Sequence, residues 1–244
     1  MQSEEIKEGL ILRVTPIKEA DAMVQAIGKD GFFSFYARGV RKMTSKNAPS
    51  VQECCYGRYS LMVSNQGKLT LKEGAPLSLL YKGDSLSAMA VGMLLNELTL
   101  KVVSEEDASD VYPWLYASLK AIQEGKEPLT IGMIYFAKVM KEAGYGLNVE
   151  ECVRCARKEG IIGISYEEGG FICKKCLRED DIAVSRPSQK TLKILLYLFR
   201  VGLEDLNRVS FEPSEVLPLY SRFGEHLQYT LGISLHSLSM ISRL

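Results

Sequence analysis

Residues 7–37, KEGLILRVTPIKEADAMVQAIGKDGFFSFYA, contain three short apolar segments separated by polar turns. Leu10, Leu12 and Val14 recur at every second position, which is the period of a half-buried β-strand over residues 7–15. Residues 22–27 predict a second strand, and the turn GKDG at residues 28–31 predicts a hairpin into a third strand at residues 32–37. The stretch therefore indicates the beginning of a β-sheet.

Two further strands follow a polar stretch at residues 38–50. They are predicted at residues 53–64 and 68–73, with the turn Asn65-Gln66-Gly67 between them. Five short strands within about 80 residues favour a small barrel, and the five-stranded OB-fold is the leading interpretation. We therefore expect an OB-fold β-barrel domain at residues 1–80.

The rest of the chain has the helical period of 3.6 residues. Apolar residues recur at this spacing in five segments, at residues 86–98, 111–122, 133–140, 192–199 and 216–227. The first segment is apolar around its whole circumference, so we expect that helix to be central and buried. The predicted fold class is α+β, in which the barrel is followed by an α-helical domain at residues 81–244.

Four of the six cysteines form a C-x2-C-x17-C-x2-C motif, at Cys152, Cys155, Cys173 and Cys176. Two residues between thiolates allow both sulfurs to face one ion, and the separation of the two pairs is typical of zinc sites. Four sulfur ligands leave no open coordination position, so the motif predicts one structural Zn²⁺. The alternatives are two redox-active pairs or unpaired structural cysteines.

Residues 148–180 around this motif contain too few apolar side chains to form a core of their own. We therefore expect a zinc-binding module, inserted within the helical domain and folded by the metal. Gly169 and Gly170 supply a hairpin turn, and nearby cations can offset the negative charge of a zinc tetrathiolate, at Arg154, Arg157, Lys174 and Lys175.

The other two cysteines and the two histidines lack a ligand pattern. Cys54 and Cys55 are adjacent in a predicted strand, so their side chains point to opposite faces and cannot bind one metal together. We expect them to be ordinary buried residues. His226 and His236 have no neighbouring ligand candidates, and we expect them to be structural or solvated.

The composition is that of an ordinary globular protein. Of 244 residues, 46% are hydrophobic and 25% are charged, which excludes disordered and fibrous classes. No apolar stretch reaches the ~18 residues of a membrane span, and the acidic start lacks the apolar core of a secretory signal. We expect a cytoplasmic protein without membrane contact. The motifs G-x-x-x-x-G-K-[ST], G-x-G-x-x-G and H-E-x-x-H are absent, so we do not expect an enzyme.

Charge is distributed unevenly, although the 30 basic and 30 acidic side chains cancel in total. Residues 29–72 carry eight basic and two acidic side chains, whereas residues 84–151 carry five basic and eleven acidic ones. A basic cluster on a strand module is typical of nucleic-acid binding. We expect phosphate contacts from Lys29, Arg38, Arg41, Lys42, Lys46 and Arg58.

Aromatic side chains interrupt this basic segment at Phe32, Phe33, Phe35 and Tyr36. An aromatic ring that stacks on a base of single-stranded nucleic acid contributes about 1–3 kcal/mol. Alternating aromatics in a strand are more often core residues, and at most two of these four can face outward. We expect one of Phe33, Phe35 or Tyr36 to stack on bases.

Taken in order, these features resemble the bacterial RecO family of recombination-repair proteins. The resemblance rests on the basic loop at residues 37–42, Gly144-Tyr145, the two cysteine pairs, Gly169-Gly170 before the second pair, and an upstream Glu19-x-Asp21 segment. Three residues depart from the family pattern. Arg38 stands where lysine is frequent, which preserves the charge but changes the hydrogen-bond geometry. Leu147 stands where proline is frequent, and Ala156 stands where glycine is common, so these two departures concern turns around the metal loop.

The resemblance implies a non-enzymatic recombination mediator. Members of the family bind single- and double-stranded DNA, anneal complementary strands and act with the partner RecR. Together they help RecA replace single-strand binding protein on DNA. The resemblance also implies a nucleoid-associated location and a groove in the helical domain for the acidic tail of single-strand binding protein.

Two other classes of function remain open at this point. One is an interaction or regulatory protein that uses its zinc ribbon to bind a protein partner without contacting DNA. The other is an enzyme with an unrecognised active site. Salt-sensitive binding to single strands distinguishes the first from a DNA-binding protein, and turnover on a nucleic acid would reveal the second.

Overall fold

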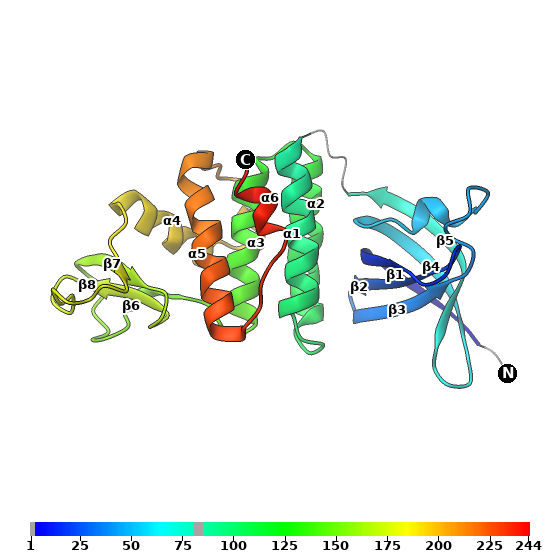
Figure 1. The fold of residues 1–244 in the computed structure, drawn as a ribbon, viewed down its shortest axis with the longest axis horizontal. Helices are drawn as coiled ribbons and strands as arrows, with labels where there is room; N and C mark the ends of the chain where they lie inside the picture. The colour runs from blue at the N-terminus through cyan, green and yellow to red at the C-terminus, as the bar shows by residue number, and fades with distance from the viewer. Residues whose placement is uncertain (1–2, 81–84) are drawn as a thin grey trace.

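The computed structural model describes residues 3–80 and 85–244. The barrel, a helical body and a small sheet follow one another along the long axis of the molecule (Figure 1). Residues 81–84, at which the helical domain is predicted to begin, lie outside the described part of the chain, as do residues 1–2.

Five strands close the barrel in the order β1-β2-β3-β5-β4. They are β1 (Ser3–Pro16), β2 (Ala22–Gly28), β3 (Gly31–Ala37), β4 (Cys55–Val63) and β5 (Leu69–Leu79). Strands β3 and β5 pair in parallel, and the other neighbours pair antiparallel. A short 3-10 turn, η1 (Ala48–Ser50), lies between β3 and β4. This arrangement confirms the predicted five-stranded OB-fold.

Strand β1 is buried on both faces in its middle. Ile11 points into the barrel core, whereas Leu10 and Leu12 belong to the core of the helical body. A register shift between Ile11 and Arg13 marks a bulge at this point. The three consecutive apolar residues are therefore explained by a strand that serves two cores.

The helical body contains all five predicted helices and one short additional helix. They are α1 (Leu86–Val102), α2 (Ala108–Gln123), α3 (Pro128–Glu142), α4 (Gln189–Arg200), α5 (Pro213–Leu231) and α6 (Leu238–Ile241). A second 3-10 turn, η2 (Leu203–Asp205), follows α4. None of the helices in the described part of the chain is long and apolar enough to cross a membrane.

The central helix is α3, and the prediction that the first helix would be central is wrong. Every residue of α3 from Leu129 to Met140 is buried, and the helix contacts α1, α2, α4 and α5. Helix α1 lies between the barrel and α3, so it needs apolar residues on two sides. Its third side is exposed at Leu86, Met89 and Met93.

Local sequence explains where several helices begin and end. The Ser85 hydroxyl accepts a hydrogen bond from the Ala88 N–H (3.1 Å), and the Ser188 hydroxyl accepts one from the Thr191 N–H (3.1 Å). Helix α5 ends at Gly232, whose φ of +67° is the left-handed conformation that glycine favours.

Glu97 of α1 holds the C-terminal segment. Its carboxylate accepts hydrogen bonds from the backbone N–H groups of His236 and Ser237, both at 2.9 Å, and pairs with Lys101 at 2.8 Å. Burial raises the pKa of Glu97, but the bonds from Lys101 and Ser237 outweigh it and lower the pKa to about 2.

Residues between α3 and α4 form a four-stranded sheet of order β6-β8-β7-β9. Its strands are β6 (Asn148–Cys152), β7 (Ile161–Ser165), β8 (Gly170–Cys173) and β9 (Val184–Ser185). Two of its few apolar residues, Ile164 and Phe171, join the main core of the helical body. The four-stranded sheet therefore packs its apolar residues into the core of the helical body.

His226 of α5 connects this sheet to the helices. It is 4% exposed, its Nδ1 lies 2.7 Å from the carbonyl oxygen of Tyr166, and its Nε2 lies 3.1 Å from that of Tyr145. Tyr145 precedes β6 and Tyr166 follows β7, and both strands pair with β8 at Gly170, so the ring fastens one end of the sheet to α5. His226 is thus a structural residue.

Candidate metal centre and nucleic-acid interface

The structure brings the four predicted metal ligands together. Cys152 ends β6 and Cys173 ends β8, and each begins a tight turn that places Cys155 or Cys176 beside it. The four Sγ atoms all lie within 4.8 Å of one another, and all four cysteines are free.

The sulfur geometry fits a metal ion. A tetrahedral site with bonds of ~2.3 Å places its sulfurs roughly 3.8 Å apart. The Sγ atoms of Cys155 and Cys173 are 3.7 Å apart, whereas a disulfide would need ~2.05 Å. The four cysteines are therefore close enough, and suitably spaced, to bind one metal ion.

The turn after the first cysteine pair contains a strained residue. Ala156 has a φ of +56°, in the left-handed region, and its N–H donates to the Cys152 carbonyl at 2.8 Å. Glycine adopts this conformation without steric cost. Alanine therefore fits the backbone at position 156 less well than the glycine that is common there in the family.

Arg154 has a different role from the one predicted. Its guanidinium forms ion pairs with Glu168 (2.6 Å) and Asp181 (2.7 Å) and donates to the Cys176 carbonyl (2.7 Å). The bonds from Arg154 lower the pKa of Asp181 to about 2. Because two carboxylates neutralise it, Arg154 fastens the two cysteine turns together rather than offsetting thiolate charge. The other three predicted counter-charges, Arg157, Lys174 and Lys175, are exposed.

The basic loop after β3 is held by Asp21. One carboxylate oxygen accepts the Gly39 N–H at 2.7 Å, and the other accepts the Tyr36 hydroxyl. These two bonds, that of Tyr36 first, lower the pKa of Asp21. Val40 is buried and anchors the loop in the barrel core. The Glu19-x-Asp21 segment therefore shapes the loop.

The loop presents cations to solvent. Arg38, Arg41, Lys42 and Lys46 are all exposed. No carboxylate of residues 3–80 or 85–244 forms an ion pair with any of them. The guanidinium of Arg41 donates to the carbonyl oxygens of Lys18 (3.1 Å) and Glu19 (3.3 Å), so Arg41 also braces the loop.

Two of the six predicted phosphate contacts lie elsewhere. Lys29 is in the β2–β3 turn, at the opposite end of β3 from the loop, and is exposed. Arg58 pairs with Glu8 of β1 at 2.7 Å. Lys72 likewise pairs with Glu4 at 2.7 Å, so acids of β1 cancel part of the charge that residues 29–72 carry.

The three candidate stacking residues differ in exposure. Phe35 is 1% exposed inside the barrel, where its ring centroid lies 5.3 Å from that of Tyr59, so the prediction is wrong for Phe35. Tyr36 is half-buried and uses its hydroxyl to bind Asp21. Phe33 is half-buried and lines a cleft at the end of the barrel.

An OB-fold barrel with an exposed basic loop, followed by a helical body with an inserted four-cysteine module, defines a class of two-part proteins built around an oligonucleotide-binding fold. Two family descriptions match in this order: Recombination protein O N terminal at residues 1–79 and Recombination protein O C terminal at residues 83–239. The chain belongs to the RecO family of DNA repair proteins.

The chain is similar over 80% or more of its length to curated members of the family. It is 24% identical over 241 residues to DNA repair protein RecO of Halalkalibacterium halodurans, covering 97% of this chain and 94% of the relative. It is 29% identical over 199 residues to DNA repair protein RecO of Bacillus velezensis (80% and 78%). For DNA repair protein RecO of Bacillus subtilis the identity is 27% over 222 residues (87% and 86%).

Proposed function

We propose that the protein is a non-enzymatic recombination mediator that binds single- and double-stranded DNA through its barrel and anneals complementary strands. The observation that carries the proposal is the basic loop, whose four cations are exposed and unpaired by carboxylates of the described chain while Asp21 holds its backbone. Phosphate binding needs such unneutralised cations and no sequence readout. Membership of a family of DNA repair proteins supports it.

The remaining roles extend this proposal. Residues 1–80 form the nucleic-acid-binding domain, residues 81–244 the helical domain, and residues 148–180 a module that one structural Zn²⁺ folds. The helical domain binds the acidic tail of single-strand binding protein, and RecR is the partner with which the protein helps RecA occupy the strand. The protein acts in the cytoplasm, at the nucleoid.

The DNA-binding proposal is tested by charge reversal in the loop. The Arg38→Glu, Lys42→Glu double variant should bind a single-stranded oligonucleotide more weakly, and its log–log salt slope should be shallower by about 1.4, since each lost phosphate contact is worth ~0.7. Arg41 is left intact because its bonds to the carbonyls of Lys18 and Glu19 support the loop.

The matched control reverses two exposed cations of the helical body, Lys126 and Lys193, and changes the net charge by the same amount. Equal losses in the two double variants, or an unchanged slope in the loop variant, would refute the assignment. Absence of salt-sensitive binding in the wild type would favour the zinc-ribbon interaction protein. Annealing of strands coated with single-strand binding protein, with and without RecR, tests the mediator role.

A further inference from the structure

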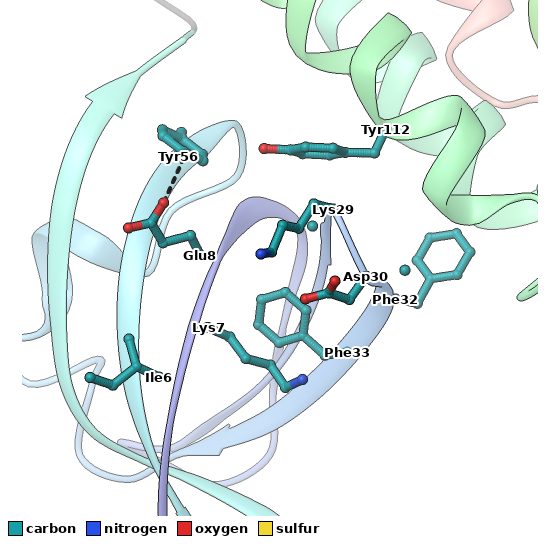
Figure 2. Close-up of a pocket in the computed structure, with 11 residues that line it drawn as sticks. Ile6, Lys7, Glu8, Lys29, Asp30, Phe32, Phe33, Tyr56 and Tyr112 are labelled. Atoms are coloured by element: carbon teal, nitrogen blue, oxygen red, sulfur yellow. Dashed lines mark hydrogen bonds between the residues drawn. The ribbon is translucent and has the colours of Figure 1, made fainter.

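A cleft of about 530 Å³ lies where the end of the barrel meets helix α2. Phe33 of β3 and Tyr112 of α2 lie on opposite sides of it, and Lys29 from the β2–β3 turn lies between them (Figure 2). Lys7 of β1 and Tyr56 of β4 also line the cleft. The barrel and the helical body therefore both contribute aromatic walls.

The Phe33 ring is held in place from behind. Its centroid lies 6.1 Å from that of Phe35 and 6.4 Å from that of Tyr59, so one side of the ring closes the barrel core. Glycines beneath it leave room, because a Cβ at Gly9 would lie 2.7 Å from the Phe33 ring. The ring is thus a fixed aromatic surface at the edge of the cleft.

Polar groups surround this surface. The ammonium group of Lys7 lies 5.7 Å from the Phe33 ring centroid, which is a cation–π contact, and it also pairs with Glu5 at 2.8 Å. On the opposite side the Tyr56 hydroxyl donates to Glu8 at 3.1 Å. These contacts orient the groups that a ligand entering the cleft would meet.

The charges in the cleft balance. Lys7 and Lys29 are matched by Glu8 and Asp30, and Glu8 is itself bound by Arg58 from outside the cleft. The bonds from Arg58 and Tyr56 lower the pKa of Glu8, so this carboxylate stays ionised. A balanced, aromatic-walled cleft favours a planar neutral group over an isolated phosphate. Within nucleic acid, that group is the base.

We propose that this cleft binds one unstacked base of single-stranded DNA against Phe33, between the barrel and α2. The inference rests on the proposed function and adds a second kind of contact to it. The basic loop attracts phosphates in a salt-dependent manner, whereas the cleft holds a base by stacking, with little salt dependence.

The test is a double-mutant cycle between Phe33 and the base. Affinity is measured for an oligothymidylate and for the same strand with abasic sites in its central positions, using the wild type and Phe33→Leu. The wild type should prefer the strand with bases by about five-fold or more, and Phe33→Leu should lose most of this preference. The salt slope of Phe33→Leu should equal that of the wild type.

Phe211→Leu is the matched control, because Phe211 is a half-buried aromatic that packs against Tyr197 in the helical body and does not line the cleft. It should keep the preference for bases. A crosslinking measurement needs no variant: a 5-iodouracil oligonucleotide irradiated on the wild-type protein should attach to Phe33 or Tyr112. Crosslinks confined to other residues would overturn the proposal even if Phe33→Leu failed to fold.

The other outcomes distinguish a failure of the proposed function from a failure of the cleft proposal alone. If the wild type does not bind single strands, the proposed function fails. If the wild type binds them but does not distinguish bases from abasic sites, or if Phe33→Leu retains the distinction, the cleft proposal alone fails. Phe33-dependent binding of free thymidine monophosphate, without any preference for bases in oligonucleotides, would make the occupant a free nucleotide and also overturn it.

Discussion

Replacing Ala156 by glycine should stabilise the four-cysteine module. Ala156 is exposed and has a φ of +56°, so the substitution removes steric strain and loses little packing. A left-handed conformation costs an L-residue roughly 1–2 kcal/mol. The extra freedom of glycine in the unfolded chain costs about 0.4–1 kcal/mol in return. The difference is a net gain of about 1 kcal/mol.

The gain should be measurable as metal affinity, because metal binding and folding of such a module are coupled. Competition with a chromophoric chelator should show Zn²⁺ held about five-fold more tightly by Ala156→Gly than by the wild type. The hydrogen bond from residue 156 to the Cys152 carbonyl involves only backbone atoms, so glycine retains it.

Ala183→Gly is the matched control. Ala183 is exposed, lies just before β9 of the same sheet and does not have a positive φ, so only the entropic cost applies there and zinc affinity should fall slightly. The two substitutions should therefore change the zinc affinity in opposite directions. If both lower the affinity, the backbone of residue 156 carries no strain that glycine can relieve.

Three further predictions concern stability. Replacing Cys152 and Cys155 by serine should reduce the bound metal from one ion per chain to none by elemental analysis and should lower the melting temperature. The pKa of Glu97 is about 2 in the folded protein, against an ordinary value of 4.5. The contribution of Glu97 to the free energy of unfolding is therefore complete above pH 4.5 and disappears as the pH falls towards 2. The difference in melting temperature between the wild type and Glu97→Gln should shrink over that range. Gly132→Ala places a Cβ 2.6 Å from Val91 Cγ1 in the most buried helix, so denaturant unfolding should show a loss of about 1–3 kcal/mol.

The sequence is sufficient to predict features that depend on local spacing. Period-two and period-3.6 patterns identified the five barrel strands and five helices, and the cysteine spacing identified four sulfurs that the fold brings within 4.8 Å. The same patterns do not show which of the buried helices is the central one. Helix α1 is apolar on two sides because it separates the barrel from α3, and only the packing reveals that arrangement.

Contacts between residues distant in sequence explain why other predicted DNA-binding residues differ in the structure. Arg58 looked available because its neighbours in sequence are uncharged, but Glu8, fifty residues away, lies opposite it on β1. Phe33 and Phe35 share one face of β3, so alternation cannot distinguish them. The distinction comes from their positions along the strand: Phe35 lies deep in the barrel, and Phe33 lies nearer the β2–β3 turn.

The separation of the loop from the cleft has a consequence for the length of strand that the protein needs. Strand β3 places Gly31 beside the cleft and Ala37 before the loop, about 20 Å apart at ~3.3 Å per residue. A strand with the roughly 3.4 Å per nucleotide of the duplex needs about six nucleotides for this span, and an extended single strand needs fewer. A dinucleotide is too short in either arrangement and should reach one site only, so that loop and cleft substitutions act on it as alternatives. Longer oligonucleotides should show losses from Phe33→Leu and the loop double variant that add in free energy, because the two sites share no contact. Additive losses on a dinucleotide would mean that the path of the DNA does not follow β3.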